Sequence, residues 1–306
     1  MSEPINLPRP SRRGRLLRVG AAFAVLLALA GYLVVQYVSG GPGAPECVAG
    51  AGDGRGSTFE LGPEQARNAA TITAVGASRG MPERAVTIAL ATALQESGLR
   101  NLDHGDRDSL GLFQQRPSMG WGTAEQIMDP VYAAGKFYEH LAEVPGYARL
   151  PLTVAAQEVQ HSGFPQAYAK HEPDAAVLMA ALTGREPAAL TCTVAKNAQP
   201  GDPAQVRAEL TKAFGDGVAP TGKPGDTGRD VAVPVRVTEG AAASGTGGEQ
   251  RGWALAHWAV AQAAALHIAQ VSYAGRTWSA EDSSEGWSGA PVQGGGTQEV
   301  RITLAP

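Results

Sequence analysis

The chain has 306 residues, 43% hydrophobic and 18% charged, a composition that excludes disorder throughout and is typical of globular domains. Its 39 glycines and 21 prolines indicate that part of the chain is linker rather than core. The formal net charge of −4 argues against nucleic acid as a partner.

The N-terminal region combines a basic tail, residues 1–18, with an uncharged apolar run, residues 19–38. At ~1.5 Å of helix rise per residue, this run is long enough to cross the ~30 Å apolar core of a bilayer. We expect a transmembrane helix at 19–38 with the basic tail in the cytoplasm, as the positive-inside rule predicts. The protein would then be a single-pass protein of the bacterial cell membrane with its main domains outside. The alternatives are a cleaved signal peptide and a buried core helix.

Two cysteines, Cys47 and Cys192, lie on the side of the chain that this topology exports. They predict a disulfide bond that would stabilise the fold by up to ~4–5 kcal/mol, because it would close a long loop. The alternative is a pair of free thiols. No C-x-x-C or H-E-x-x-H pattern occurs, so we expect neither a metal nor another cofactor.

Apolar periodicity after the Gly/Pro-rich stalk at 39–56 predicts a domain of helices at 57–194. A first helix should run over 63–78, and a second should begin at Pro82 and end at Gly98, with Glu96 on its buried stripe. A long polar loop at 99–122 follows, of the kind that often carries function. Further helices are expected at 124–128, 130–143, 152–162 and 173–182.

The C-terminal third begins with a linker at 195–228, which contains a short helical patch at 203–214. A small α+β domain at 229–306 should follow. Its expected elements are an edge strand at 231–237, a helix at 251–268, and strands at 270–274 and 299–304. The predicted fold class is therefore mainly α, with one transmembrane helix, a helical domain and a small α+β C-terminal domain.

Two neighbouring motifs indicate chemistry. One is Ala93-Leu94-Gln95-Glu96-Ser97-Gly98, and the other is Asp108-Ser109-Leu110-Gly111-Leu112-Phe113-Gln114-Gln115. Together they resemble the soluble lytic transglycosylase branch of the lysozyme-like family, in which E-S-G ends a helix and G-L-M-Q follows. The resemblance covers about residues 63–181. It implies a lysozyme-like fold at 57–194, peptidoglycan glycan strands as the substrate and Glu96 as general acid/base. It also implies that Ser97, Gly111, Phe113 and Gln114 bind substrate.

The sequence departs from this family at one segment. Many members carry A-Y-N-x-G on a later helix, where this chain has Val159-Gln160-His161-Ser162-Gly163. The family's tyrosine beside the glutamate is therefore absent. Gln160, His161 and the nearby Tyr168 are the candidates to contact the substrate in its place. Trp121 is a further candidate, since its ring could stack on a sugar or pack on the core.

The position of Glu96 suits acid catalysis. A carboxyl group on an apolar stripe near the negative end of a helix is favoured in its protonated form. Glycosidic cleavage needs such an acid to protonate the leaving oxygen. A hydrolase would need a second acid, for which Asp103, Asp106 and Asp108 are candidates. The competing interpretation of Glu96 is an ion pair with Arg100, and that of the three aspartates is turn formation.

Two functions remain open on these observations. The first is an enzyme that cleaves the glycan strand of peptidoglycan, as a lytic transglycosylase or a muramidase. The second is a catalytically weak wall-binding or scaffold protein with the same fold. The C-terminal domain resembles small domains appended to exported cell-wall proteins and lacks the H-x(6)-D and H-x-H zinc patterns of related peptidases. Its His257 and His267 are interpreted as ordinary polar positions, and its role as binding or spacing. The oligomeric state is left undetermined.

Overall fold

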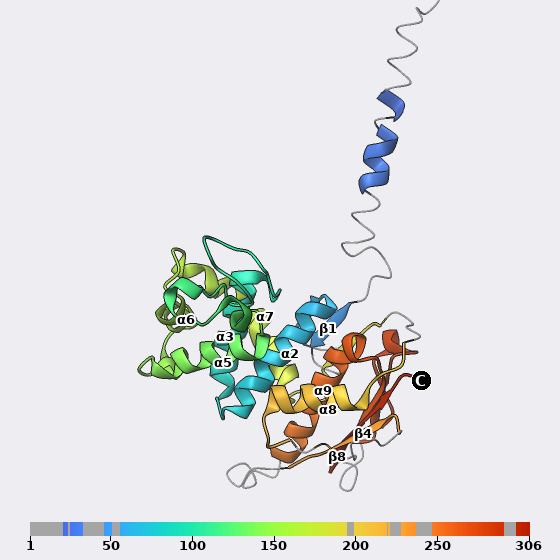
Figure 1. Ribbon diagram of the computed structural model, residues 1–306. Coiled ribbons are helices and arrows are strands. Elements are labelled where there is room, and N and C mark those ends of the chain that lie inside the picture. Colours follow the sequence, from blue (N-terminus) through green and yellow to red (C-terminus); the bar gives the residue numbers. More distant parts are fainter. Residues whose placement is uncertain are drawn as a thin grey trace, which may run out of the picture. The chain divides into compact units, whose positions relative to one another are not determined.

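The computed structural model describes residues 21–23, 25–32, 46–50, 56–194, 199–218, 220, 228–236, 247–290 and 298–306. The chain divides into two compact units, Met1–Ala44 and Pro45–Pro306 (Figure 1). Apart from the N-terminal apolar run, the elements and sites analysed below all belong to the second unit. The expected basic tail at 1–18 lies outside the described residues.

The N-terminal apolar run gives a result that differs from the sequence-based prediction. Residues 21–23 and 25–32 are helical. Among the described residues, no helix combines the length and the apolarity that a membrane crossing requires. A span needs about 20 helical residues. The predicted transmembrane helix at 19–38 and the single-pass membrane localisation are therefore wrong.

Helices dominate the first part of Pro45–Pro306 (Figure 1). They are α2 (Pro63–Ser78), α3 (Glu83–Ser97), α4 (Ala124–Ile127), α5 (Pro130–Glu143), α6 (Leu152–Gln160) and α7 (Glu172–Leu182), with the 3-10 segments η1 (Pro117–Met119), η2 (Tyr147–Arg149) and η3 (Pro165–His171). Helix α3 is the central one, because α2, α5, α6, α7 and η3 all contact it. Every residue from Ala85 to Leu94 is buried. The many alanines on α2 and α3 let these helices pack closely.

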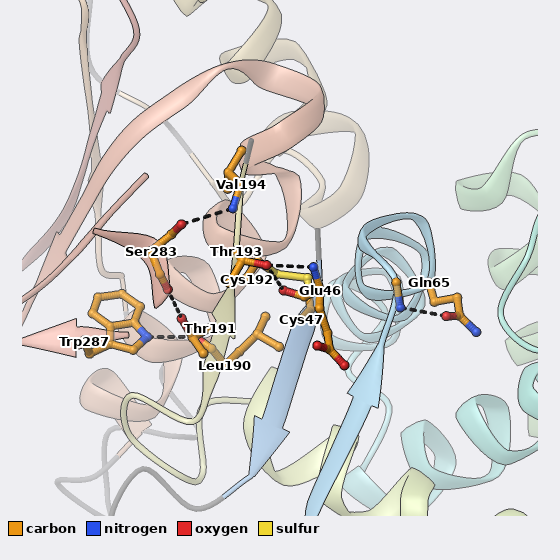
Figure 2. The surroundings of a disulfide bond; sticks show 11 residues. Glu46, Cys47, Gln65, Leu190, Thr191, Cys192, Thr193, Val194, Ser283 and Trp287 are labelled. Carbon is orange, nitrogen blue, oxygen red and sulfur yellow. Dashed lines mark hydrogen bonds between the residues drawn. A yellow bond between two sulfur atoms is a disulfide. The ribbon is translucent and has the colours of Figure 1, made fainter. Parts of the chain in front are cut away.

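A short antiparallel sheet joins the two ends of this helical part. Its strands are β1 (Cys47–Gly50), β2 (Thr58–Leu61) and β3 (Leu190–Cys192), in the order β2-β1-β3. Cys47 lies directly opposite Cys192 in the ladder, and the two form a disulfide (Figure 2). The predicted disulfide is confirmed. It links residues 145 positions apart, which by loop entropy contributes about 4–5 kcal/mol.

The second part of this unit contains a larger antiparallel sheet. The elements are α8 (Pro203–Phe214), β4 (Asp230–Pro234), α9 (Gly247–Leu266), β5 (Ile268–Tyr273), β6 (Arg276–Ser279), η5 (Ser283–Glu285), β7 (Trp287–Ser288) and β8 (Glu299–Leu304). The strand order is β4-β8-β5-β6-β7, so β4 lies at the edge, as Pro234 predicts. Helix α9 packs on β5 and β8. The described residues thus form helices with two antiparallel sheets, and the predicted mainly α fold class is wrong because it omitted the first sheet and included a transmembrane helix.

Hydrogen bonds connect the two sheets. The Trp287 indole Nε1 donates to the carbonyl oxygen of Leu190 at 2.8 Å, and the Val194 N–H donates to Ser283 Oγ at 3.1 Å (Figure 2). Helix α9 also packs against α2 and α7. The C-terminal elements therefore share one folded unit with the helical part.

His257 lies at the centre of this junction and is fully buried. Its Nε2 accepts a hydrogen bond from the Ala189 N–H at 3.0 Å, and its Nδ1 lies 2.7 Å from the Ala181 carbonyl oxygen. An acceptor at Nε2 requires the neutral ring with its proton on Nδ1. Burial lowers the pKa of His257 to about 4. The interpretation of His257 as an ordinary polar position of a helix is thus wrong, since the ring is a buried cross-link between helices.

The pH dependence of unfolding tests this role of His257. The pKa of His257 is near 6.5 in the unfolded chain and about 4 in the folded one. The contribution of His257 to the free energy of unfolding is therefore fully present above pH 6.5 and is lost as the pH falls toward 4. By linkage the loss reaches about 3 kcal/mol at pH 4. Urea unfolding at pH 7, 6, 5 and 4 should show this slope in the wild type and in His104→Asn, whose site is exposed. His257→Asn should be less stable at pH 7, and its free energy of unfolding should fall less steeply between pH 6.5 and pH 4. The same pH dependence in His257→Asn and the wild type would contradict the assignment of His257 as a buried neutral ring.

Candidate functional site

The candidate site is built on the C-terminal turn of α3. The helix ends at Gly98, whose φ of 61° is left-handed and favours glycine. Two side chains of α2 then hold the chain that leaves the helix. Gln65 Nε2 donates to the Gly98 carbonyl oxygen at 2.7 Å, and Asn68 Nδ2 donates to that of Leu99 at 2.8 Å. The last turn of α3, which carries Glu96, is therefore fixed at its end.

Glu96 is half-buried, and one of its two carboxyl oxygens is held. The Tyr168 hydroxyl of η3 donates a hydrogen bond to Glu96 Oε1 at 2.6 Å. Among the described residues, Oε2 has no hydrogen-bond partner, and it is not among the enclosed polar atoms. No ion pair joins Glu96 to Arg100 in the described part of the chain, so the interpretation of Glu96 as the ion-pair partner of Arg100 is not supported by a contact. The carboxyl group thus has one positioned oxygen and one accessible oxygen.

The Tyr168 hydroxyl stays protonated and can therefore donate its hydrogen bond throughout the neutral pH range. The side chain is buried, and burial raises the pKa of its hydroxyl above the usual value of 10.0. Donation to Glu96 raises this pKa further, because a negative charge next to the hydroxyl disfavours its ionisation. The hydroxyl therefore keeps its proton at neutral pH and offers it to Glu96.

The second motif lies against the first one. Ser97 is buried, and its hydroxyl donates to the Leu112 carbonyl oxygen at 2.8 Å. The Phe113 ring is fully buried and stacks on Phe137 with centroids 4.6 Å apart. Gln160 Nε2, at the end of α6, donates to the Phe113 carbonyl oxygen at 2.8 Å. In this structure Ser97, Phe113 and Gln160 hold the loop in place beside α3.

Gly111 and Gln114 form the turn of this loop. The Gly111 N–H donates to the Leu102 carbonyl oxygen at 2.7 Å, and Leu110 pairs with Gln115 across the turn. Gln114 Nε2 donates to the Gly111 carbonyl oxygen at 3.3 Å and to that of His104 at 3.4 Å. Gly111 has a φ of 75°. The motif is therefore a compact turn tied to the start of the loop.

Trp121 and His161, which the sequence suggested as substrate contacts, have no described contact with Glu96. The half-buried Trp121 stacks on His140 with centroids 4.2 Å apart, and its carbonyl oxygen accepts from the Tyr132 hydroxyl. His161 caps α6 with a left-handed φ of 49°, and its side chain is exposed.

The three loop aspartates all have basic partners. Asp103 is 2.7 Å from His104, and Asp106 is 3.9 Å from Arg107. Asp108 accepts from Arg116 Nε at 2.8 Å and from the N–H and hydroxyl of Ser118. The Arg116 bond, and then the bonds from Ser118, hold the pKa of Asp108 well below its usual range. Asp108 therefore organises the loop and remains a carboxylate, which cannot donate a proton.

Two cavities in this unit lie apart from Glu96. One, of about 240 Å³, is enclosed by residues of α2, α3, α7, α8 and α9. The other, of about 340 Å³, lies among α2, α5, α8 and α9. Neither is lined by Glu96, so the expected sugar groove stays a prediction. In the described part of the chain, no group of three His, Cys, Asp or Glu side chains is arranged to hold a metal ion.

Sequence reasoning missed the roles of Gln65 and Asn68. Both are polar residues on a helix whose buried residues are mostly small or apolar. A polar side chain among buried apolar ones needs a hydrogen-bond partner. The free carbonyl groups at the end of a neighbouring helix are such partners, and this is the signal that could have revealed the two roles.

Comparison with known proteins gives one partial match. Residues 203–301 match the model of the VldE family, C-terminal domain. The match begins at the first residue of α8 and ends within β8, so it coincides with the second part of the folded unit. It covers about one third of the chain and does not include Glu96. None of the curated proteins compared with the chain matches it.

Substitution of Gly111 tests the geometry of the loop. A Cβ atom there would lie 2.8 Å from the Ile127 carbonyl oxygen, in addition to the cost of the left-handed backbone. Gly111→Ala should lower the free energy of unfolding by about 2–4 kcal/mol, measured in urea. The control is Gly120→Ala, where φ is 84° but nothing lies within 4 Å, so that only the backbone cost of about 1–2 kcal/mol applies. Equal losses in the two variants would show that the loop does not pack against Ile127 as described.

Proposed function

We propose that this protein cleaves the glycan strand of peptidoglycan, with Glu96 as general acid and then base. The observation that carries the proposal is the 2.6 Å hydrogen bond from the Tyr168 hydroxyl to Glu96 Oε1, in a half-buried site. The motif resemblance supplies the substrate class. The family's usual tyrosine is absent from the expected position, and the contact from Tyr168 is the reason to retain the enzymatic interpretation.

The two carboxyl oxygens of Glu96 have different roles in a two-step cleavage: Oε2 transfers the proton, and Oε1 is held by Tyr168. In the first step Glu96 Oε2 gives its proton to the glycosidic oxygen, the bond from the anomeric carbon to that oxygen breaks, and positive charge develops on the sugar. The carboxylate that remains is stabilised by the hydrogen bond from Tyr168 to Oε1. In the second step the oxygen of the attacking hydroxyl bonds to the anomeric carbon while Oε2 takes its proton, which removes the positive charge and restores the acid.

The loop aspartates favour the transglycosylase over the hydrolase. A hydrolase needs a second carboxylate to activate water or attack the sugar. Asp103, Asp106 and Asp108 each lie against a basic side chain, and Asp108 is held by three hydrogen bonds. In the resembling family the 6-hydroxyl of muramic acid attacks within the same sugar, so one carboxyl group suffices.

A wall-binding protein with little or no activity is the second candidate. One observation favours it. Gln160, expected to donate to the substrate, gives its N–H to the Phe113 carbonyl oxygen instead.

Digestion of purified peptidoglycan by the full chain tests the proposal. We expect the wild type to release muropeptides with anhydro ends, identified by mass, whereas a hydrolase would give reducing ends. Glu96→Gln should lower the release rate by 10² to 10⁴, which is the usual contribution of general acid-base catalysis. The matched control is Glu158→Gln on α6, an exposed glutamate that should behave as the wild type.

Two results would contradict the enzymatic proposal. One is a Glu96→Gln protein that releases fragments as fast as the wild type. The other is a folded wild type that sediments with peptidoglycan but releases nothing, which would establish the binding function instead.

A further inference from the structure

The cavity of about 340 Å³, here called the junction cavity, lies where the helical part meets α8 and α9. Its size is at the lower end of the range for small-ligand sites, and such sites often lie between substructures. Its walls come from α2, the loop after α3, the start of α5, α8 and the end of α9. The lining residues are Arg67, Asn68, Thr71, Asn101, Asp129, Pro130, Val131, Gln205, Glu209, Lys212, Gln262, Ala265 and Leu266.

Gln262 is the observation that points to a ligand. The side chain lies on α9 and is only 6% exposed, yet it borders the cavity. Within the described residues its amide makes no hydrogen bond, and neither polar atom is fully enclosed by protein. A buried amide without a partner costs about 1–3 kcal/mol. A cost of this size is consistent with a side chain that serves a bound molecule.

Asn68, on α2, offers a second amide to the same cavity. The residue is 2% exposed and its Nδ2 is used by the Leu99 carbonyl oxygen. Its Oδ1 accepts no hydrogen bond among the described residues and is not fully enclosed. The cavity therefore presents an acceptor at Asn68 and a donor with an acceptor at Gln262, the set that a peptide group requires.

The charges around the cavity are of both signs. Lys212 pairs with Asp129 at 2.9 Å, which neutralises one pair of charges. Arg67 and Glu209 have no ion-pair partner among the described residues. A ligand with both a carboxylate and an ammonium group would complement these two side chains.

We propose that the junction cavity binds a short peptide with free ends, of about dipeptide size. Arg67 receives the carboxylate, Glu209 receives the ammonium group, and Gln262 and Asn68 bind the peptide group. A sugar fits less well, because no aromatic side chain lines the cavity for a ring to stack on. A simple anion fits less well, because the carboxylates of Glu209 and Asp129 also line it.

Calorimetric titration of the full chain with alanyl-alanine tests the proposal. We expect saturable binding that is weakened at least tenfold by N-acetylation and at least tenfold by amidation of the peptide. Maltose is the sugar control and should not bind. Gln262→Leu should weaken dipeptide binding at least tenfold while its melting temperature is equal to or above that of the wild type, because it removes an unpaired buried amide. Arg207→Gln, on α8 but outside the cavity, should bind as the wild type.

Three outcomes would overturn this proposal. They are the absence of dipeptide binding at millimolar concentration, equal binding of the free and capped peptides, and unchanged binding by Gln262→Leu. Tighter binding of maltose would also overturn it and assign the cavity to sugars. None of these outcomes depends on Glu96, so the glycan-cleavage proposal stands or falls separately.

Discussion

The burial of α3 is the constraint on which the rest of this structure depends. All residues from Ala85 to Leu94 are enclosed, and α2, α5, α6, α7 and η3 pack around them. The last turn is the part of the helix that leaves the core, and it carries Glu96. Because the helix cannot rotate without disturbing the whole packing, the carboxyl group has a fixed direction. A catalytic acid needs that kind of support.

Hydrogen bonds then hold three separate segments, the loop, α6 and η3, around this turn. Ser97 binds the loop through the Leu112 carbonyl oxygen, Gln160 binds the next carbonyl oxygen from α6, and Tyr168 reaches Glu96 from η3. The disulfide and the buried His257 act further away: the disulfide joins β1 to β3, and His257 joins α9 to the chain at Ala181 and Ala189. The site is therefore a property of the whole folded unit rather than of one motif.

Apolar periodicity was enough to predict α2, α3 and α5. Helix α5 buries one stripe of side chains, whereas α3 is buried on all sides from Ala85 to Leu94. It could not predict β1 or β3, which have only four and three residues; β3 pairs with β1 across 145 positions of sequence. Tyr168 was one of three candidates beside Glu96, since a 3-10 segment has no periodic signal that says which side chain turns inward. The pairing of Asn68 and Gln262 across one cavity also depends on packing that no local pattern encodes.

The rate of glycan release by Tyr168→Phe tests the central claim most directly. Loss of a hydrogen bond to a charged group costs about 1.5–3 kcal/mol, so the rate should fall about 10- to 100-fold while the fold is retained. Tyr138→Phe, which removes a buried hydroxyl bonded to the Ile72 carbonyl oxygen and with no described hydrogen bond to Glu96, is the matched control and should keep the wild-type rate. A Tyr168→Phe protein as fast as Tyr138→Phe would contradict the account.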